Sequence, residues 1–432
     1  MEVIIRKIHP FRLTLALWVV MLVPTTTQAV ADEAWVPIGP EGGVISNVVQ
    51  HPTQTQVLYI IVGVYQPSLY KSTDGGMVWN KLYVFSRQIT TLAVNPKNAN
   101  ELYAGASGPF LKSTDGGTTW NTASTVTGDF REVIPDSADS NVLHACGSSY
   151  PKGQKENYSL TYFKSTDRGS TWSVMSASTV KGSGTALCFD PQNPNLVFVG
   201  GYGADKATVQ LFKTTDGGAT WSDAAGSISG TVSDILLHSG SEMRIYAATS
   251  AGVYRSTDAG TTWTKNNGFI GGDVLALDKK NHILYLGAIR QVYRSIDGGA
   301  NWMYHSYENA SAGFTNAILV DPSQPSTVFA GSNGGFFRST DSGLSWSESN
   351  AGIMATNITA IASEPGSPEV LFAAQESGYV YKTQNALAKP SAPQSVAWQK
   401  FYQIPNCNSF GVKTILFDPS RPNTMYLYKE YG

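Results

Sequence analysis

The chain has 432 residues, with 30 Lys and Arg against 32 Asp and Glu and a formal net charge of −2 at pH 7. Charged residues make up 14 % of the sequence, too few for a disordered chain kept open by charge. The balanced charge leaves no basic surface of the kind that binds nucleic acid. With 42 glycines and 21 prolines, the composition favours a folded protein rich in turns.

The first residues have the pattern of a secretory signal peptide. A basic segment over residues 6–12 precedes an apolar run at 13–23, which is too short to cross a bilayer. An A-x-A cleavage signal follows and ends at Ala31. We therefore expect residues 1–31 to be removed, with cleavage after Ala29 or an uncleaved membrane anchor as alternatives. The mature chain has no further stretch that could span a membrane, so we expect export to the periplasm or the extracellular space.

One short phrase recurs seven times after this segment. It has the form [S/T]-x-D-x-G-x-x-W, as in the copy that ends at Trp120, and we call it the repeat phrase. A decayed eighth copy begins at Lys382. The aspartates of the seven copies are Asp74, Asp115, Asp167, Asp216, Asp258, Asp297 and Asp341. Spacings from 39 residues (258 to 297) to 52 residues (115 to 167) indicate a repeat architecture.

Strand signals surround every repeat phrase. An apolar run that ends in Pro or a turn, such as residues 91–96, is followed by an aromatic run such as 102–105. A third run leads into the phrase and a fourth begins at its tryptophan, which gives strands A to D in chain order. Repeated four-stranded antiparallel units predict an all-β fold, a β-propeller over residues 32–432. We expect about eight blades, with seven to ten possible and the last one incomplete at the C-terminus.

The recurring aspartates are predicted to be structural. The phrase suits a tight hairpin, in which its glycine adopts a left-handed backbone and the carboxylate accepts hydrogen bonds from turn amides. The tryptophan is expected to lie between neighbouring blades. Ligand or metal binding by these aspartates is the alternative. We expect no metal and no cofactor, because histidines and cysteines show no ligand spacing. Cys146, Cys188 and Cys407 are predicted to be buried free thiols, with a disulfide as the alternative.

Antiparallel strand order puts the B–C and D–A loops on one face of a propeller, which we call the loop face. Two long B–C loops, at residues 147–161 and 201–210, make this face the predicted ligand-binding surface. Its candidate ligand-binding residues are Tyr150, Lys152, Tyr158, Tyr202, Lys206, Arg131 and Asp273. The candidate catalytic acids are Asp129, Glu132 and Asp205. The alternative is that these are ordinary solvated loop residues.

The repeat phrase resembles the Asp-box, or BNR, repeat of sialidases, two-propeller xyloglucanases, sortilin-type receptors and photosystem II assembly propellers. The opening at residues 35–43 and the DP…LYAG phrases are most similar to the xyloglucanase and sortilin branches. The resemblance covers nearly all of residues 35–432 and implies the propeller fold, but it says little about activity. The arginine of the sialidase R-I-P phrase is missing before Ile134, and residues 62–67 lack the acid of the xyloglucanase D-V-G-G phrase.

These residues favour an exported, monomeric binding or scaffold module that recognises a glycan or protein ligand through the loop face. The alternative is a glycoside hydrolase of the xyloglucanase type or, less well supported, of the sialidase type, including a degenerate relative that has lost activity. A third candidate is a role like that of the photosystem assembly propellers.

Overall fold

The computed structural model describes residues 2–4, 42–64, 66–124, 126, 128–150, 158–205, 208–239, 242–266, 271–307, 313–353, 358–375, 379–386, 398–403, 412–418 and 421–429. All regular secondary structure in these residues is β-strand. Within the same residues there is no helix of the length and apolarity needed to cross a membrane. The predicted all-β fold is confirmed.

The chain divides into two compact units. One unit is Glu41–Thr356, and the other combines Met1–Pro40 with Asn357–Gly432. Most of the predicted signal peptide lies outside the described residues; within it the structure describes only β1 (Glu2–Ile4).

The larger unit contains seven four-stranded antiparallel blades, which we number 1 to 7; blades 3 and 4 share one strand and together form a seven-stranded sheet. Blade 1 consists of β2 (Ile45–Gln50), β3 (Leu58–Val62), β4 (Ser68–Ser72) and β5 (Asn80–Val84). Blade 2 consists of β6 (Ile89–Val94), β7 (Leu102–Ala106), β8 (Phe110–Ser113) and β9 (Asn121–Ser124). Blade 3 has β10 (Gly128–Pro135), β11 (Leu143–Ser149), β12 (Ser159–Ser165) and the first part of β13 (Ser173–Asp190). The long strand β13 therefore serves two blades, because its second part pairs with β14.

The remaining blades follow the same order. Blade 4 continues from β13 with β14 (Asn193–Gly203), β15 (Val209–Thr214) and β16 (Ser222–Asp223). Blade 5 consists of β17 (Val232–Ser239), β18 (Met243–Thr249), β19 (Gly252–Ser256) and β20 (Thr264–Lys265). Blade 6 consists of β21 (Val274–Asp278), β22 (Ile283–Ala288), β23 (Gln291–Ser295) and β24 (Met303–Ser306). Blade 7 consists of β25 (Thr315–Val320), β26 (Val328–Ser332), β27 (Gly335–Ser339) and β28 (Ser347–Glu348).

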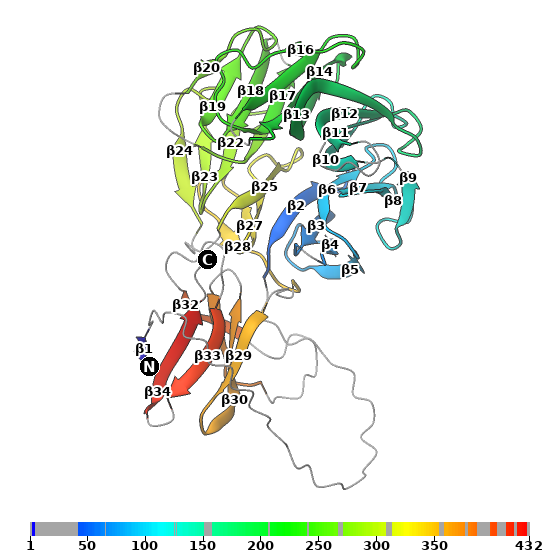
Figure 1. The fold of residues 1–432 in the computed structure, drawn as a ribbon. Coiled ribbons are helices and arrows are strands. Elements are labelled where there is room, and N and C mark those ends of the chain that lie inside the picture. Colours follow the sequence, from blue (N-terminus) through cyan, green and yellow to red (C-terminus); the bar gives the residue numbers. More distant parts are fainter. Residues whose placement is uncertain are drawn as a thin grey trace. The chain divides into compact units, whose positions relative to one another are not determined.

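The seven blades close into a ring. The first strand of each blade contacts the first strand of the next, and β25 of blade 7 contacts β2 of blade 1 (Figure 1). The closure is noncovalent: the Gly42 amide donates to the Ile353 carbonyl at 2.7 Å, and the Trp79 amide donates to the Ala351 carbonyl at 2.8 Å. The strands named A in the sequence are thus the inner strands of a closed seven-bladed propeller.

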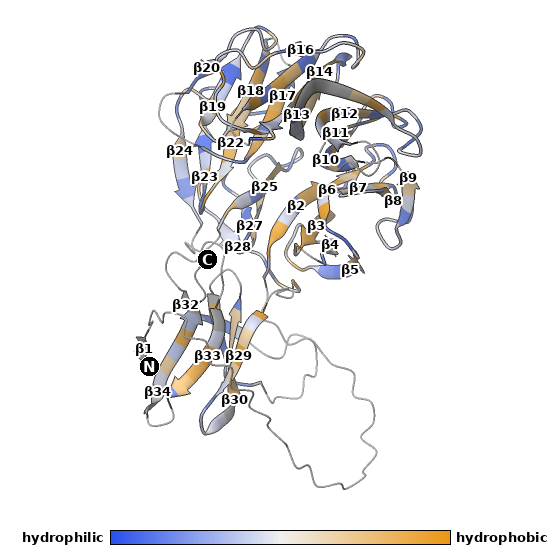
Figure 2. Ribbon diagram, viewed as in Figure 1, coloured by the Kyte–Doolittle hydropathy of each residue, from blue (hydrophilic) through white to orange (hydrophobic). Residues whose placement is uncertain are grey.

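Hydrophobic side chains fill the spaces between blades. Figure 2 shows apolar residues concentrated on strands inside the blades, whereas outer strands such as β20 are hydrophilic. The tryptophan of a repeat phrase packs against aromatic rings of the preceding blade: Trp172 lies 4.9 Å from Phe110, and Trp221 lies 5.5 Å from Tyr162, between ring centroids. The predicted placement of these tryptophans between neighbouring blades is confirmed for both.

The smaller unit contains an eighth four-stranded sheet. Its strands are β29 (Ile358–Glu364), β30 (Ser367–Gln375), β31 (Tyr379–Thr383) and β32 (Trp398–Gln403). A further pair, β33 (Val412–Asp418) and β34 (Arg421–Lys429), forms a three-stranded sheet with β1, which pairs in parallel with β34. The two sheets share one apolar core. The closed ring contains seven of the blades predicted from the repeats, and the eighth sheet belongs to the smaller unit.

Candidate functional site

The aspartates of the repeat phrases bind their own turns. The Ser113 hydroxyl donates to Oδ1 of Asp115 at 2.8 Å, and the amide and hydroxyl of Thr119 donate to Oδ1 and Oδ2 at 2.9 and 2.6 Å. These hydrogen bonds, those from Thr119 first, lower the pKa of Asp115 to about 2. In all seven copies the Ser or Thr two residues before the aspartate donates to its Oδ1. This geometry supports a structural role, since none of the seven aspartates lines the central cavity described next.

A β-bulge recurs at the start of the inner strands. Six of the seven show a register shift there, for example between Phe130 and Glu132 in β10. A bulge bends the strand and turns one side chain away from the sheet pattern, and bulges are frequent next to functional sites. The bulged residues are Ser46, Thr90, Arg131, Thr185, Ser233 and Asn316; in blade 6 Asp273 occupies the equivalent place just before β21. We call these seven the mouth residues.

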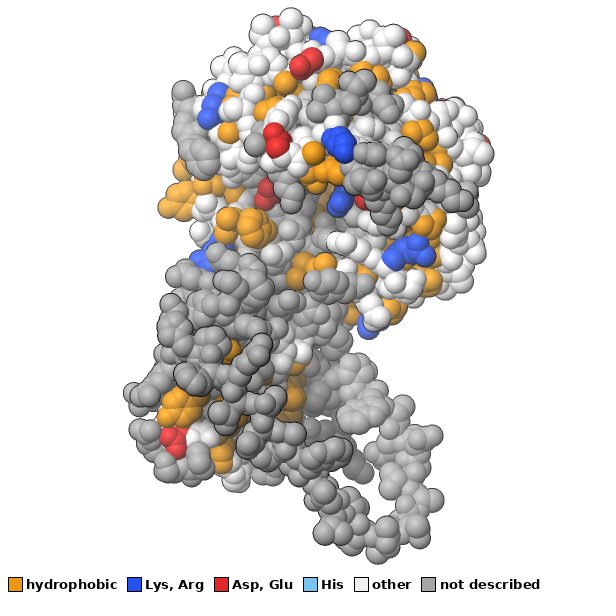
Figure 3. Space-filling model, viewed as in Figure 1, with side chains coloured by type: hydrophobic (Ala, Val, Ile, Leu, Met, Phe, Trp, Pro, Cys, Tyr) orange, Lys and Arg blue, Asp and Glu red, His pale blue; other side chains and the backbone are white. Residues whose placement is uncertain are grey.

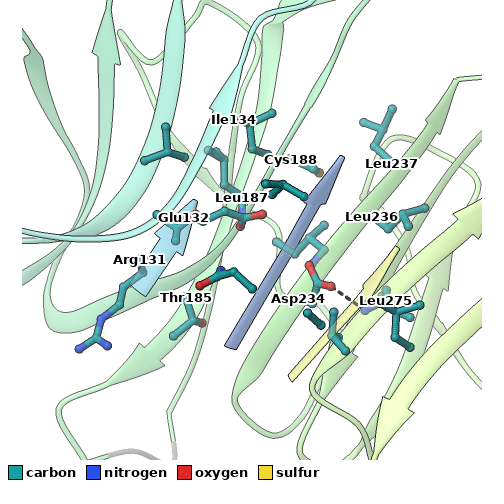
Figure 4. Close-up of a pocket in the computed structure, with 18 of the residues that line it drawn as sticks. Arg131, Glu132, Ile134, Thr185, Leu187, Cys188, Asp234, Leu236, Leu237 and Leu275 are labelled. Atoms are coloured by element: carbon teal, nitrogen blue, oxygen red, sulfur yellow. Dashed lines mark hydrogen bonds between the residues drawn. The ribbon is translucent and has the colours of Figure 1, made fainter. Parts of the chain in front are cut away.

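The mouth residues lie at one end of a central cavity of about 960 Å³. The inner strands of all seven blades line this cavity, and the seven mouth residues are part of its lining. Two of them, Arg131 and Thr185, are labelled in Figure 4. Three mouth residues join neighbouring blades: the Thr90 hydroxyl donates to the Phe130 carbonyl, the Thr185 hydroxyl to the Val232 carbonyl at 2.5 Å, and Asn316 Nδ2 to the Ile45 carbonyl at 2.9 Å.

The two charged mouth residues are Arg131 and Asp273. The Nε atom of Arg131 is buried and has no hydrogen-bond partner among the described residues. Partial desolvation at the cavity raises the pKa of Asp273. Unlike the three residues that join blades, Arg131 therefore keeps a donor without a partner among the described residues.

Two further carboxylates, Glu132 and Asp234, face the cavity next to the mouth. Oε2 of Glu132 accepts the Leu187 amide at 2.6 Å, and Oδ2 of Asp234 accepts the Leu275 amide at 2.6 Å, so each joins its blade to the next (Figure 4). Burial raises the pKa of Asp234 to about 6. Burial and the nearby charge of Asp234 raise the pKa of Glu132. The two groups therefore bind protons more readily than ordinary carboxyls.

The structure places the candidate acids differently from the sequence prediction. Asp129, Arg131 and Glu132 are predicted to lie on the loop face, but they stand on strand β10, because β10 pairs with β11 from Gly128 onward. Glu132 lines the cavity, whereas Asp129 does not. Asp205 also lies outside the cavity, exposed, where it accepts the amide and hydroxyl of Thr208 at 2.8 and 2.6 Å. The three predicted acids are therefore not brought together.

The predicted loop-face residues are partly described. Tyr150, Tyr158 and Tyr202 are all half-buried. Burial and the charge of Asp129 raise the pKa of Tyr150. Lys152 and Lys206 lie outside the described residues. Both long loops are shorter than expected, because strands β11, β12, β14 and β15 extend into them.

Asp234 is the cavity carboxylate that was not predicted from the sequence. It occupies the same position of β17 that Glu132 occupies in β10, directly after the bulge. Ala186 and Ala317 stand there in blades 4 and 7. An acid within an otherwise apolar inner strand was the available signal, and alignment of the seven inner strands would have found it.

Metal-binding clusters and disulfides are not found in the part of the chain that the structure describes. It contains no group of three or more His, Cys, Asp or Glu residues that could hold a metal ion. Cys146 and Cys188 are free and buried, as predicted, and burial raises the pKa of both thiols. Cys407 lies outside the described residues.

No protein-family model and no curated protein matches the chain. Solved structures do match it. The GH74 xyloglucanase from Xanthomonas campestris is 16 % identical with a TM-score of 0.59, over 88 % of this chain and 70 % of that one. An ancestral GH74 enzyme is 16 % identical with a TM-score of 0.58, over 92 % and 67 %. YCF48 bound to D1 peptide is 13 % identical with a TM-score of 0.51, over 69 % and 94 %. At such identities the likeness establishes the β-propeller fold and leaves the activity to be argued from the site.

Proposed function

We propose that this protein is a binding module whose ligand, a glycan or a protein segment, engages the loop face at the mouth of the central cavity. The observation that carries the proposal is the ring of mouth residues: seven inner strands each place one polar side chain around a single cavity. Side chains on strands of a closed ring are held in place before a ligand arrives, which reduces the entropy lost on binding. Export and a monomeric state belong to the same proposal.

Arg131 and the tyrosines provide the recognition chemistry. The guanidinium group of Arg131, a residue that lines the cavity, can donate to a hydroxyl, carbonyl or carboxylate of the ligand. Half-buried tyrosines such as Tyr158 and Tyr202 offer a flat apolar ring together with a hydroxyl, which suits both sugar rings and peptide segments. The glycan alternative can be tested directly, because soluble polysaccharides serve as probes.

Affinity electrophoresis in gels that contain xyloglucan or mixed-linkage β-glucan tests the glycan alternative, and immobilised sialosides extend the panel. We expect retardation of the wild type by one of these probes, and a loss of at least about tenfold in affinity for Arg131→Ala and for the double variant Tyr158→Ala/Tyr202→Ala. Lys265→Ala, on the outer strand β20, is the matched control and should migrate as the wild type. Unchanged affinity in both loop-face variants would remove the proposal for a glycan ligand.

A glycoside hydrolase is the second candidate function, and Glu132 with Asp234 is the observation that favours it. Acid–base hydrolysis of a glycosidic bond uses two carboxyl groups, one of which is held protonated near neutral pH. Burial raises the pKa of both groups, that of Asp234 to about 6, which favours such a role. The backbone amides that both carboxylates accept give them a structural role as well. Release of reducing ends from xyloglucan, β-glucans or sialosides, abolished in Glu132→Gln, Asp234→Asn, Asp129→Ala or Asp205→Ala, would establish this function in place of simple binding.

A further inference from the structure

The basic residue before each repeat phrase often joins one blade to the next. Lys213 Nζ donates to the Ala259 carbonyl at 3.1 Å, Arg255 to the Gly298 carbonyl at 3.4 Å, and Arg294 Nε to the Ser342 carbonyl at 3.0 Å. Each acceptor is the residue directly after the aspartate of the next repeat phrase. This bond links the outer parts of neighbouring blades at three successive junctions.

Arg338 of blade 7 departs from this pattern at the junction where the ring closes. The equivalent acceptor would be the carbonyl of Gly75 in blade 1, but Arg338 Nε is buried and has no hydrogen-bond partner among the described residues. The other two arginines in this position, Arg255 and Arg294, both make the bond. A buried donor without an acceptor is unfavourable by about 1–3 kcal/mol. The junction bond that holds Arg255 and Arg294 therefore does not account for the place of the Arg338 guanidinium.

Arg338 lines a cavity of about 530 Å³, which we call the seam cavity. It lies beside the repeat phrases of blades 7 and 1, and none of its lining residues lines the central cavity. The segment that closes the ring forms one wall, held by the Ser349 hydroxyl, which donates to the Gly76 carbonyl at 2.6 Å. Its volume is within the range of small-molecule sites, roughly 300–1,000 Å³.

The seam cavity combines donors, acceptors and one apolar group. Arg338 offers donors, Glu348 a carboxylate, and Thr340 and Ser347 hydroxyls. Asn350 is already engaged, since its Oδ1 accepts the Phe336 amide at 2.8 Å and its Nδ2 donates to Oε2 of Glu348 at 3.5 Å. Met77, 58 % exposed, supplies the apolar contact. The Glu348 carboxylate would repel an anion, and an apolar molecule would offer no acceptor to the Arg338 guanidinium. A neutral molecule that carries many hydroxyls, which both donate and accept, suits all these groups.

We propose that the seam cavity binds one residue of a neutral saccharide, with Arg338 donating to its oxygens and Met77 in contact with its C–H face. This is a second site, separate from the loop-face site proposed above.

Methionine methyl NMR tests the proposal at the site itself. The protein is labelled with [¹³C-methyl]methionine and titrated with the methyl glycosides of glucose, galactose, mannose and xylose, each up to about 50 mM, which detects millimolar complexes. We expect one of them to shift the Met77 signal and to leave that of Met303, exposed on β24, in place. Arg338→Leu should weaken the Met77 response by at least about tenfold, whereas the matched variant Arg255→Leu, which breaks a junction bond elsewhere, should retain it.

The results that would overturn the proposal are equally specific. They are an unmoved Met77 signal with all four glycosides, equal shifts of Met77 and Met303, or an unchanged response in Arg338→Leu. A response to methyl glucuronide alone would replace the neutral saccharide by an anion and so contradict it. The double variant Tyr158→Ala/Tyr202→Ala should leave the Met77 response intact, so the loop-face proposal and this one can fail separately.

Discussion

Trp79 of blade 1 packs edge-on against Phe336 of blade 7, with the ring centroids 4.8 Å apart and an interplanar angle of 74°. Trp79 is only 2 % exposed, and its Nε1 donates to the Ser349 carbonyl at 3.1 Å. The contact joins the two ends of the ring without a covalent bond. Trp79 thus packs against an aromatic ring of blade 7 across the closure, just as Trp172 and Trp221 pack against aromatic rings of the blade that precedes them in sequence.

Trp79→Ala should therefore destabilise the larger unit by more than the loss of one outer tryptophan elsewhere. Removal of a fully buried tryptophan leaves a cavity and is unfavourable by about 3–5 kcal/mol. Urea unfolding followed by circular dichroism measures this loss. Trp302→Ala is the matched control, because Trp302 stands at the same position of blade 6 but is only half-buried. Equal losses in the free energy of unfolding for the two substitutions would show that the contact at the closure does not stabilise the unit more than Trp302 does.

Asp115 provides the test of the structural role of the repeat aspartates. Asp115→Ala removes an acceptor from Ser113 and Thr119 and should lower the melting temperature. Asp115→Asn should lower it less, because an amide oxygen can still accept; in the decayed copy, Asn385 accepts the Thr383 hydroxyl at 2.7 Å. Since the folded pKa of about 2 is below the ordinary value of 3.8, the stabilisation is present above pH 3.8 and is lost as the pH falls toward 2. A variant of unchanged stability that no longer binds its ligand would refute the structural role.

The repeat phrases allowed most of the fold to be predicted. Their turns depend on hydrogen bonds within a few residues, such as Ser113 to Asp115, so the sequence determines them locally. The place where the ring closes could not be predicted in the same way. It depends on contacts between residues far apart in sequence, Trp79 with Phe336 and Gly42 with Ile353, and the count of repeats does not say which copies belong to the ring.

The candidate site was predicted only in part for a related reason. Glu132 was identified, but Asp234 was not, because the two acids become neighbours only when the third and fifth blades face one cavity. Asp205 was predicted as a candidate acid because it lies in a long loop, yet its carboxylate accepts hydrogen bonds from the amide and hydroxyl of Thr208 in that same loop. Loop length is visible in the sequence, whereas convergence of strands on the axis is a property of the closed ring.

Asp234→Asn should raise the stability of the protein at alkaline pH. The folded pKa of about 6 lies above the ordinary value of 3.8, so the folded state binds the proton more tightly. Its contribution is fully present below pH 3.8 and is lost as the pH rises through 6. The asparagine oxygen can still accept the Leu275 amide, so the variant should gain on the order of 1–3 kcal/mol over the wild type at pH 8 and nothing near pH 4. Asp205→Asn, on the exposed loop, is the control; a loss of stability at pH 8 in Asp234→Asn would contradict the prediction.

His144 should give the opposite dependence on pH. Its ring is fully buried, stacked on Phe189 with centroids 4.2 Å apart, and its Nδ1 lies 2.6 Å from the Tyr162 hydroxyl. Burial, with the charge of Lys164 adding to it, lowers the pKa to about 4, although Asp136 acts against the shift. In the unfolded chain His144 therefore becomes protonated below pH 6.5, whereas in the folded chain it becomes protonated only near pH 4.

The wild type should consequently lose roughly 2–3 kcal/mol of stability as the pH falls from 6.5 to 4, and His144→Phe should lack this loss. At pH 8 the variant should instead be less stable than the wild type, because the Tyr162 hydroxyl loses its partner. His282→Asn, in the exposed turn between β21 and β22, is the control and should follow the wild type.

Melting temperatures of His144→Phe, Asp234→Asn and the double variant, measured between pH 4 and 8, separate the contributions of the two groups. The two substitutions change the slope of stability against pH in opposite directions. Parallel curves for the wild type and His144→Phe would show that this histidine does not control stability in acid.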